Sequence, residues 1–71
     1  MKGYQLRLKN RRVAVYDLEK DDESEAVGIV FTKLANRKER DIRRVRITIS
    51  AEAAKALAAL LVFVLDKREH P

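Results

Sequence analysis

Residues 42–65 read IRRVRITISAEAAKALAALLVFVL, and the hydrophobic period of this stretch changes at Ser50. Before Ser50, apolar residues at odd positions alternate with Arg44, Arg46 and Thr48, which is typical of a half-buried strand. Ser50 can accept a hydrogen bond from an early backbone N–H, and Glu52 suits the positive first turn of a helix. Residues 51–68 are strong helix formers. We therefore expect a strand that runs directly into a C-terminal helix.

Three further strands are predicted upstream of this junction. In residues 4–9, Tyr4, Leu6 and Leu8 alternate with polar residues, and a tight turn is expected at Asn10-Arg11. Residues 12–18 and 26–34 are rich in β-branched and aromatic side chains. Gly28 suggests a bulge or a close backbone approach within the third strand. The sequence predicts one α+β domain over residues 1–71, a four-stranded antiparallel meander followed by one helix (ββββα).

The chain is short for a self-sufficient core. A domain of this size buries only about 60% of the surface that its unfolded chain exposes. The 71 residues include no cysteine, and the single histidine, His70, is the second-last residue, so disulfides and thiolate metal sites are excluded. We expect no cofactor and no metal. Association with a second copy is the remaining means of reinforcement.

The predicted helix is apolar nearly all round. One stripe at helical spacing is long enough to pack across a sheet, and it comprises Ala53, Leu57, Leu60, Leu61 and Val64. Ala59, Val62 and Phe63 lie well round the cylinder from it. A single sheet covers only one side, so these three residues predict the interface of a symmetric homodimer. The alternative is that Val62 and Phe63 fold under the third strand of the same chain.

Charge is unevenly distributed along the chain. Residues 1–20 carry +4, residues 21–25 carry −4, residues 33–46 carry +5 and residues 47–71 are balanced, which gives the net +5. Basic blocks of this kind attract polyanions. No signal peptide is visible, and the longest apolar run is about half the length that spans a bilayer, so we expect a cytoplasmic protein without membrane contact. High Lys, Arg and Glu content with few thermolabile residues is typical of thermophiles.

No arrangement of residues suits catalysis. The two serines, Ser24 and Ser50, fall in an acidic connection and at a helix cap, and no histidine is placed to act as a base. The acidic run at residues 21–25 lacks the spacing and the glycine of a calcium loop, so we interpret it as a solvated turn. The two glycines are isolated and form no phosphate-binding loop. We expect a binding protein and not an enzyme.

Basic residues on the strands predict a nucleic-acid surface. Exposed strand positions of one sign repel each other unless a ligand neutralises them, although a solvated face is the alternative explanation. Tyr16 can lie beside these cations and stack on a base, whereas Tyr4 and Phe31 are expected in the core. A mobile basic flap would be formed by Lys33, Arg37, Lys38 and Arg40. The predicted nucleic-acid-binding residues are Arg7, Lys9, Arg11, Arg12, Tyr16, Lys33, Arg37, Lys38, Arg40, Arg44 and Arg46.

The expected ligand is single-stranded. A duplex reader usually inserts a helix into the major groove, and the only predicted helix here is neutral and Ala/Leu-rich. Sheets with aromatic residues commonly hold unpaired strands. The alternatives are an RNA-binding or duplex-binding regulator, a protein-interaction subunit that docks through its apolar helix and, more distantly, a metal-dependent nuclease.

The order of elements resembles a known family. Residues 12–17 (RVAVYD) are similar to the basic-apolar strand, and residues 47–52 (ITISAE) to the strand-to-helix junction, of the positive-cofactor-four transcriptional coactivators and the archaeal Thermoproteales single-stranded-DNA-binding proteins. The resemblance covers most of the chain through short motifs. It implies a homodimer whose curved sheets hold single-stranded DNA with little sequence preference. The chain departs from the family in having no tryptophan and a short second connection.

Overall fold

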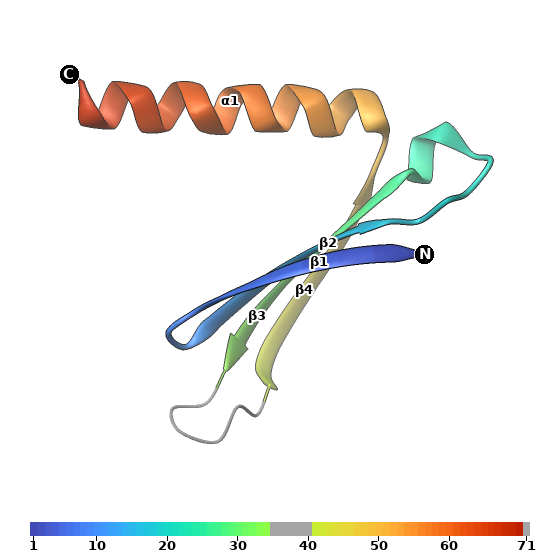
Figure 1. The fold of residues 1–71 in the computed structure, drawn as a ribbon, viewed down its shortest axis with the longest axis horizontal. Coiled ribbons are helices and arrows are strands. Elements are labelled where there is room, and N and C mark those ends of the chain that lie inside the picture. Colours follow the sequence, from blue (N-terminus) through green and yellow to red (C-terminus); the bar gives the residue numbers. More distant parts are fainter. Residues whose placement is uncertain (35–40, 71) are drawn as a thin grey trace.

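The computed structural model describes residues 1–34 and 41–70, which form one sheet and a long helix (Figure 1). The strands are β1 (Lys2–Leu8), β2 (Arg11–Asp17), β3 (Val27–Leu34) and β4 (Asp41–Ile49). A 3-10 helix, η1 (Glu23–Glu25), lies between β2 and β3, and α1 (Ala51–Glu69) follows β4. The strand order is β1-β2-β3-β4 with antiparallel neighbours. The predicted α+β class and ββββα meander are confirmed.

The first turn lies one residue earlier than predicted. Leu8 pairs with Arg11, which leaves Lys9 and Asn10 as the two turn residues. Lys9 and not Asn10 takes the positive φ, at 51°. Lys9 is therefore outside the strand, and the prediction that it continues the face of Arg7 is wrong. We call this end of the sheet the turn end.

Gly28 is not the site of a bulge. It pairs in register with Tyr16 and Thr48, and the register shift lies instead between Lys33 and Leu34. A Cβ added at Gly28 would lie 3.3 Å from Leu18 Cδ2, so the close neighbour is a side chain.

The core of the described residues is small and lies in the middle of the sheet. Its buried side chains come from β2 and β3, and they are Ala14, Ile29, Val30, Thr32 and Leu34. The Leu34 amide donates to the Asn10 carbonyl at 2.7 Å, which ties the end of β3 to the first turn. The prediction that Tyr4 and Phe31 belong to the core is wrong for the single chain, because they are 73% and 46% exposed.

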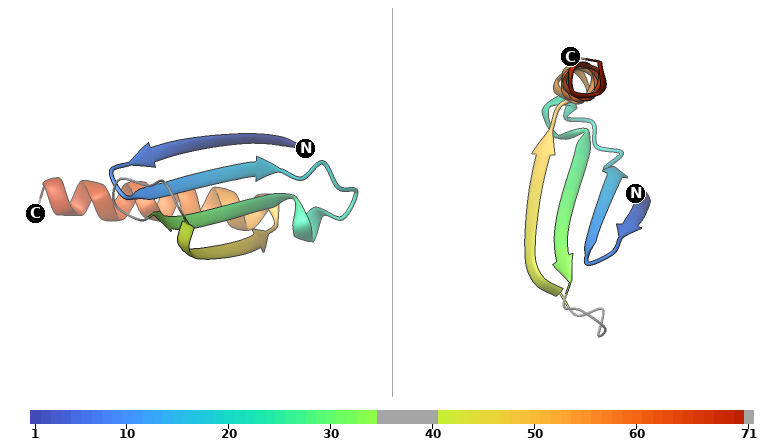
Figure 2. Two further views of the ribbon diagram at one scale, coloured as in Figure 1. Left: turned by 90° about the horizontal axis from the view of Figure 1, so that it is seen from below. Right: turned by 90° about the vertical axis from the view of Figure 1, so that its left-hand side faces the viewer.

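The helix begins as predicted but does not pack on the sheet. The Ser50 hydroxyl accepts from the Ala53 amide at 3.0 Å, which confirms the N-cap. From there α1 extends back on one side of the sheet and diverges from the strands toward its C-terminal end (Figures 1 and 2). Its only contacts of any extent within the described part of the chain are with η1, at its N-terminal end. Leu61 and Val64 are 55% and 60% exposed, so the predicted packing of this stripe across the sheet of its own chain is wrong. Within residues 1–34 and 41–70, no helix has the length and apolar character needed to cross a membrane.

Candidate nucleic-acid interface

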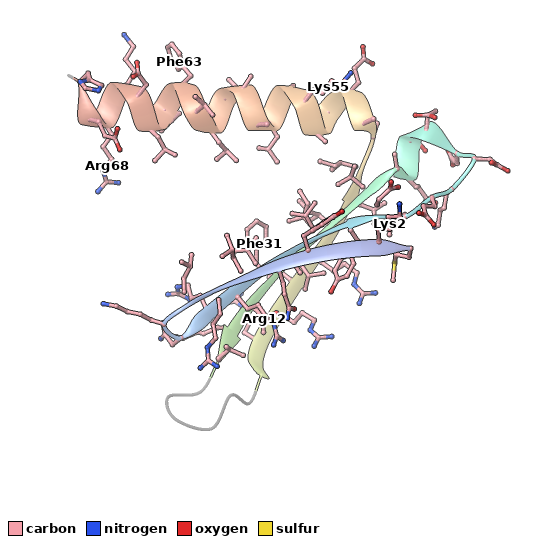
Figure 3. The ribbon with its side chains drawn as sticks, viewed as in Figure 1. Lys2, Arg12, Phe31, Lys55, Phe63 and Arg68 are labelled. Carbon is pink, nitrogen blue, oxygen red and sulfur yellow. The ribbon has the colours of Figure 1, made fainter. Side chains whose placement is uncertain are left out.

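The strand register divides the sheet into two chemically different faces. Paired residues on neighbouring strands share a face, and successive residues along a strand alternate between faces. One face, which we call the basic face, carries Gly3, Gln5, Arg7, Arg12, Ala14, Tyr16, Gly28, Val30, Thr32, Arg44, Arg46 and Thr48. The other, the apolar face, carries Tyr4, Leu6, Leu8, Val13, Val15, Val27, Ile29, Phe31, Val45, Ile47 and Ile49, with charged residues at its two ends. Phe31 points to the side where α1 lies, and Arg12 points to the opposite side (Figure 3).

Three arginines form a row across the basic face near the turn end. Arg7 pairs with Arg12, and the row continues through Thr32 to Arg44 on β4. Thr32 is buried at 4% exposure, whereas the Arg44 side chain is exposed. The Arg7 Nε donates to the Lys9 carbonyl at 3.3 Å, which holds this guanidinium over the turn. A row of guanidiniums on one sheet face offers several donors to phosphate oxygens at once.

Tyr16 lies on the same face, two rows further from the turn end, and the row of Ala14 and Arg46 lies between it and the three arginines. Tyr16 is half-buried, and a Cβ added at Gly3 would clash with Cδ1 and Cε1 of its ring, so the ring lies over the space that Gly3 leaves empty. A hollow of about 310 Å³ lies beside the ring and is lined by Gly28, Arg46 and Thr48 among others. That volume is within the range of small-ligand pockets. The arrangement puts an aromatic ring and a guanidinium at the edges of one hollow.

The other predicted binding residues lie elsewhere. Arg11 and Lys33 pair with each other on the apolar face, because Arg11 has the opposite alternation from Arg12. Arg43, which the sequence analysis did not single out, pairs with Lys33 on that same face. Neighbouring residues on a strand face opposite sides, so Arg11 and Arg43 could have been separated from Arg12 and Arg44 by the sequence pattern alone. Arg37, Lys38 and Arg40 lie outside the described residues.

The predicted dimer residues are open to solvent in the single chain. Ala59 is exposed, and Val62 and Phe63 are 67% and 58% exposed. Phe63 points away from the sheet (Figure 3), and the Lys67 Nζ lies 5.5 Å from the centre of its ring. The alternative in which Val62 and Phe63 fold under the third strand is therefore wrong.

In the acidic connection between β2 and β3, several charged side chains form hydrogen bonds or ion pairs within the chain. The Ser24 hydroxyl and amide donate to the Asp22 carboxylate at 2.6 and 3.0 Å, and these hydrogen bonds lower the pKa of Asp22. Lys20 and Glu25 form an ion pair at 3.0 Å, and the amino group of Met1 pairs with Glu19 at the same distance. Among residues 1–34 and 41–70, no three His, Cys, Asp or Glu side chains are grouped so that they could hold a metal ion.

Comparison with known proteins leaves the family resemblance as a prediction. No protein-family model matches the chain, and neither a curated protein nor a solved structure matches it.

Proposed function

We propose that the protein binds single-stranded DNA with little sequence preference, through the basic face of a homodimer. The observation that carries this proposal is the composition of that face. It presents Arg7, Arg12, Arg44 and Arg46 together with Tyr16, and none of the positions named above for this face is acidic. Cations neutralise phosphates whatever the sequence, and an aromatic ring stacks on any base, so this chemistry gives affinity without base readout.

The form of the surface favours unpaired strands. It is a sheet face, and α1 has no basic side to place in a major groove, because Lys55, Lys67 and Arg68 are balanced by Glu52, Asp66 and Glu69. The hollow beside Tyr16 can accept a base only when that base is out of a duplex stack. RNA presents the same phosphates and bases, so the DNA preference is the part of the proposal that competition must test.

A salt titration with a labelled mixed-sequence single strand tests the proposal, with duplex DNA and RNA as competitors. We expect log affinity to fall with log salt by about 0.7 for each phosphate contacted. Reversing Arg44→Glu and Arg46→Glu should weaken binding about tenfold or more for all sequences alike, and it should reduce the salt slope by about 1.4. The matched control reverses Lys2→Glu and Lys55→Glu, away from the arginine row (Figure 3). Unchanged affinity after the arginine reversals would refute the assignment.

The exposed helix favours a second candidate, a protein-interaction subunit. Leu60, Val62 and Leu65 are all more than half exposed, and an apolar helix of this kind can lie on a different protein. Measuring the mass of the purified protein in solution separates the two. A discrete dimer supports the homodimer, whereas an aggregating chain that binds no nucleic acid supports a heterologous partner.

A further inference from the structure

The turn end of the apolar face carries three cations in a row. Arg11 pairs directly with Lys33, and Lys33 pairs with Arg43. We call these residues the cation row. Among the described residues, no carboxylate pairs with any of them, and like charges placed directly opposite one another on a sheet are destabilising. The row borders a hollow of about 370 Å³ that Val13, Phe31 and Val45 also line. A ligand that fits this place is therefore apolar along most of its length and acidic at one end.

Helix α1 has that composition on the side that faces away from its own sheet. At about 100° per residue, Asp66 and Glu69 lie at the C-terminal end of the side that carries Ala59 and Val62. Figure 3 shows the neighbouring Phe63 pointing away from the sheet. Asp66 lies about 60° round the helix from Phe63 and is directed away from the cation row of its own chain, whereas Glu69 lies on the flank of the helix, about 100° from Arg68.

The side of α1 that faces its own sheet has the opposite charge at its end. Arg68 points toward the sheet side in Figure 3 and continues the stripe of Leu57, Leu61 and Val64. Closing the helix onto its own sheet would bring Arg68 toward cations of the same sign. Charge therefore opposes the closure of a single chain on itself and leaves both apolar surfaces for another molecule.

We propose that α1 of a second copy lies on the apolar face, with the partner's Asp66 and the partner's Glu69 against Arg11, Lys33 and Arg43. This inference rests on the proposed homodimer and adds its geometry. The two-fold exchange makes the same contact twice, so each helix has the partner's sheet on one side and the partner's helix on the other. That double contact accounts for a helix that is apolar nearly all round.

The dimensions agree with this arrangement. A helix of 19 residues is about 28 Å long at 1.5 Å per residue, and the nine residues of β4 span about 30 Å at 3.3 Å per residue. A helix that lies along the strands therefore reaches from one end of the apolar face to the other. In the exchanged dimer the basic faces are turned outward, on opposite sides of the two apolar layers. Arg11 and Lys33 then belong to the protein–protein contact and not to the nucleic-acid surface.

Charge exchange between two variants tests the contact. The first variant carries Arg11→Glu and Lys33→Glu, and the second carries Asp66→Lys and Glu69→Lys. Alone, each should have a dimer dissociation constant raised at least about tenfold, because like charges meet in both contacts. Mixed at equal concentrations, they should form a one-to-one heterodimer, since both of its contacts pair opposite charges. Sedimentation and native mass spectrometry measure the species, and circular dichroism checks that each variant is folded.

A matched control removes the effect of net charge. Arg7→Glu with Arg44→Glu changes the charge by the same amount on the opposite face at the same end of the sheet. This control should remain dimeric alone, lose affinity for single-stranded DNA and show no preference for the Asp66→Lys, Glu69→Lys variant. We expect a heterodimer only when the Asp66→Lys, Glu69→Lys variant is mixed with the Arg11→Glu, Lys33→Glu variant.

Three results would overturn the inference. They are variants that remain as dimeric as the parent protein, a mixture that restores nothing, and a monomeric parent protein. DNA binding is measured in parallel, so a failure of this contact is distinguishable from a failure of the proposed function. An Arg11→Glu, Lys33→Glu variant that stays dimeric but loses DNA affinity would return the cation row to the nucleic-acid surface.

Discussion

The two faces of the sheet are built from alternate residues of the same four strands, yet they interact with water in different ways. The basic face is stable in solution because mobile counterions screen its arginines and leave when a polyanion binds. Counterions do nothing for the apolar face, because the exposed side chains of Tyr4, Leu6 and Phe31 leave water only by contact with other apolar surface. Under the proposed function, the basic face binds and releases a ligand, whereas a second copy covers the apolar face.

The largest effect is expected from a carboxylate placed in the middle of the apolar face, which tests whether this face is covered by a second copy. Phe31 lies between Val13 and Val45 in the register, and it is 46% exposed in the single chain. If a second copy covers it, Phe31→Glu should destabilise the dimer by more than about 3 kcal/mol through lost packing and a buried charge. We expect a monomer by light scattering and a thermal midpoint that no longer rises with protein concentration.

Gln5→Glu supplies the control for this change. Gln5 lies on the basic face of the edge strand β1, and its substitution introduces the same carboxylate. The dimer should persist, and only DNA affinity should fall. A Phe31→Glu protein that remains dimeric would show that the apolar face is not the interface.

The next prediction concerns the contribution of Tyr16 to DNA affinity. Tyr16 is the only aromatic residue among the described positions of the basic face. Tyr16→Ala should reduce the affinity for single strands by about 1–3 kcal/mol, the range for one stacked base, while Tyr16→Phe should retain most of it. Gly3→Val should produce part of the same loss, because its side chain meets the ring carbons that lie over Gly3. Fluorescence anisotropy with a labelled oligonucleotide measures all three variants. Equal affinities for Tyr16→Ala and the parent protein would remove stacking from the proposal.

Much of this organisation is readable from the alternation of the strands. The period of two in β1 and β4 predicts the strands and separates Arg44 and Arg46 from Val45 and Ile47. The same rule separates Arg11 from Arg12, but a set of basic residues defined only by charge ignores it. Grouping Arg11 and Lys33 with the other cations by charge alone therefore overlooks that the register places them on the apolar face.

The position of the helix could not be predicted in the same way. An apolar stripe such as Leu57, Leu61 and Val64 shows that a helix side needs cover, and it does not identify the chain that supplies it. The turn is a second example, since either Lys9 or Asn10 could take the positive φ and pairing of Leu8 with Arg11 decides between them. The helix position depends on which chain covers its apolar side, and the turn depends on the register of the two strands that it joins.

The smallest expected effect concerns Ser50, the residue that joins the sheet to the helix. Ser50→Ala removes the hydroxyl that accepts from the Ala53 amide and should cost about 1 kcal/mol, which lowers the thermal midpoint by about 4–8 °C. Ser50→Asp keeps an acceptor at the cap and should retain most of the stability. Because the cap serves α1 and α1 lies on the side of the apolar face, the loss should appear in thermal unfolding at fixed protein concentration. The affinity of the folded protein for single-stranded DNA should stay the same, since Ser50 is outside the basic face. A parallel loss of DNA affinity would mean that the two faces are coupled through the helix, and the separation of their roles would then fail.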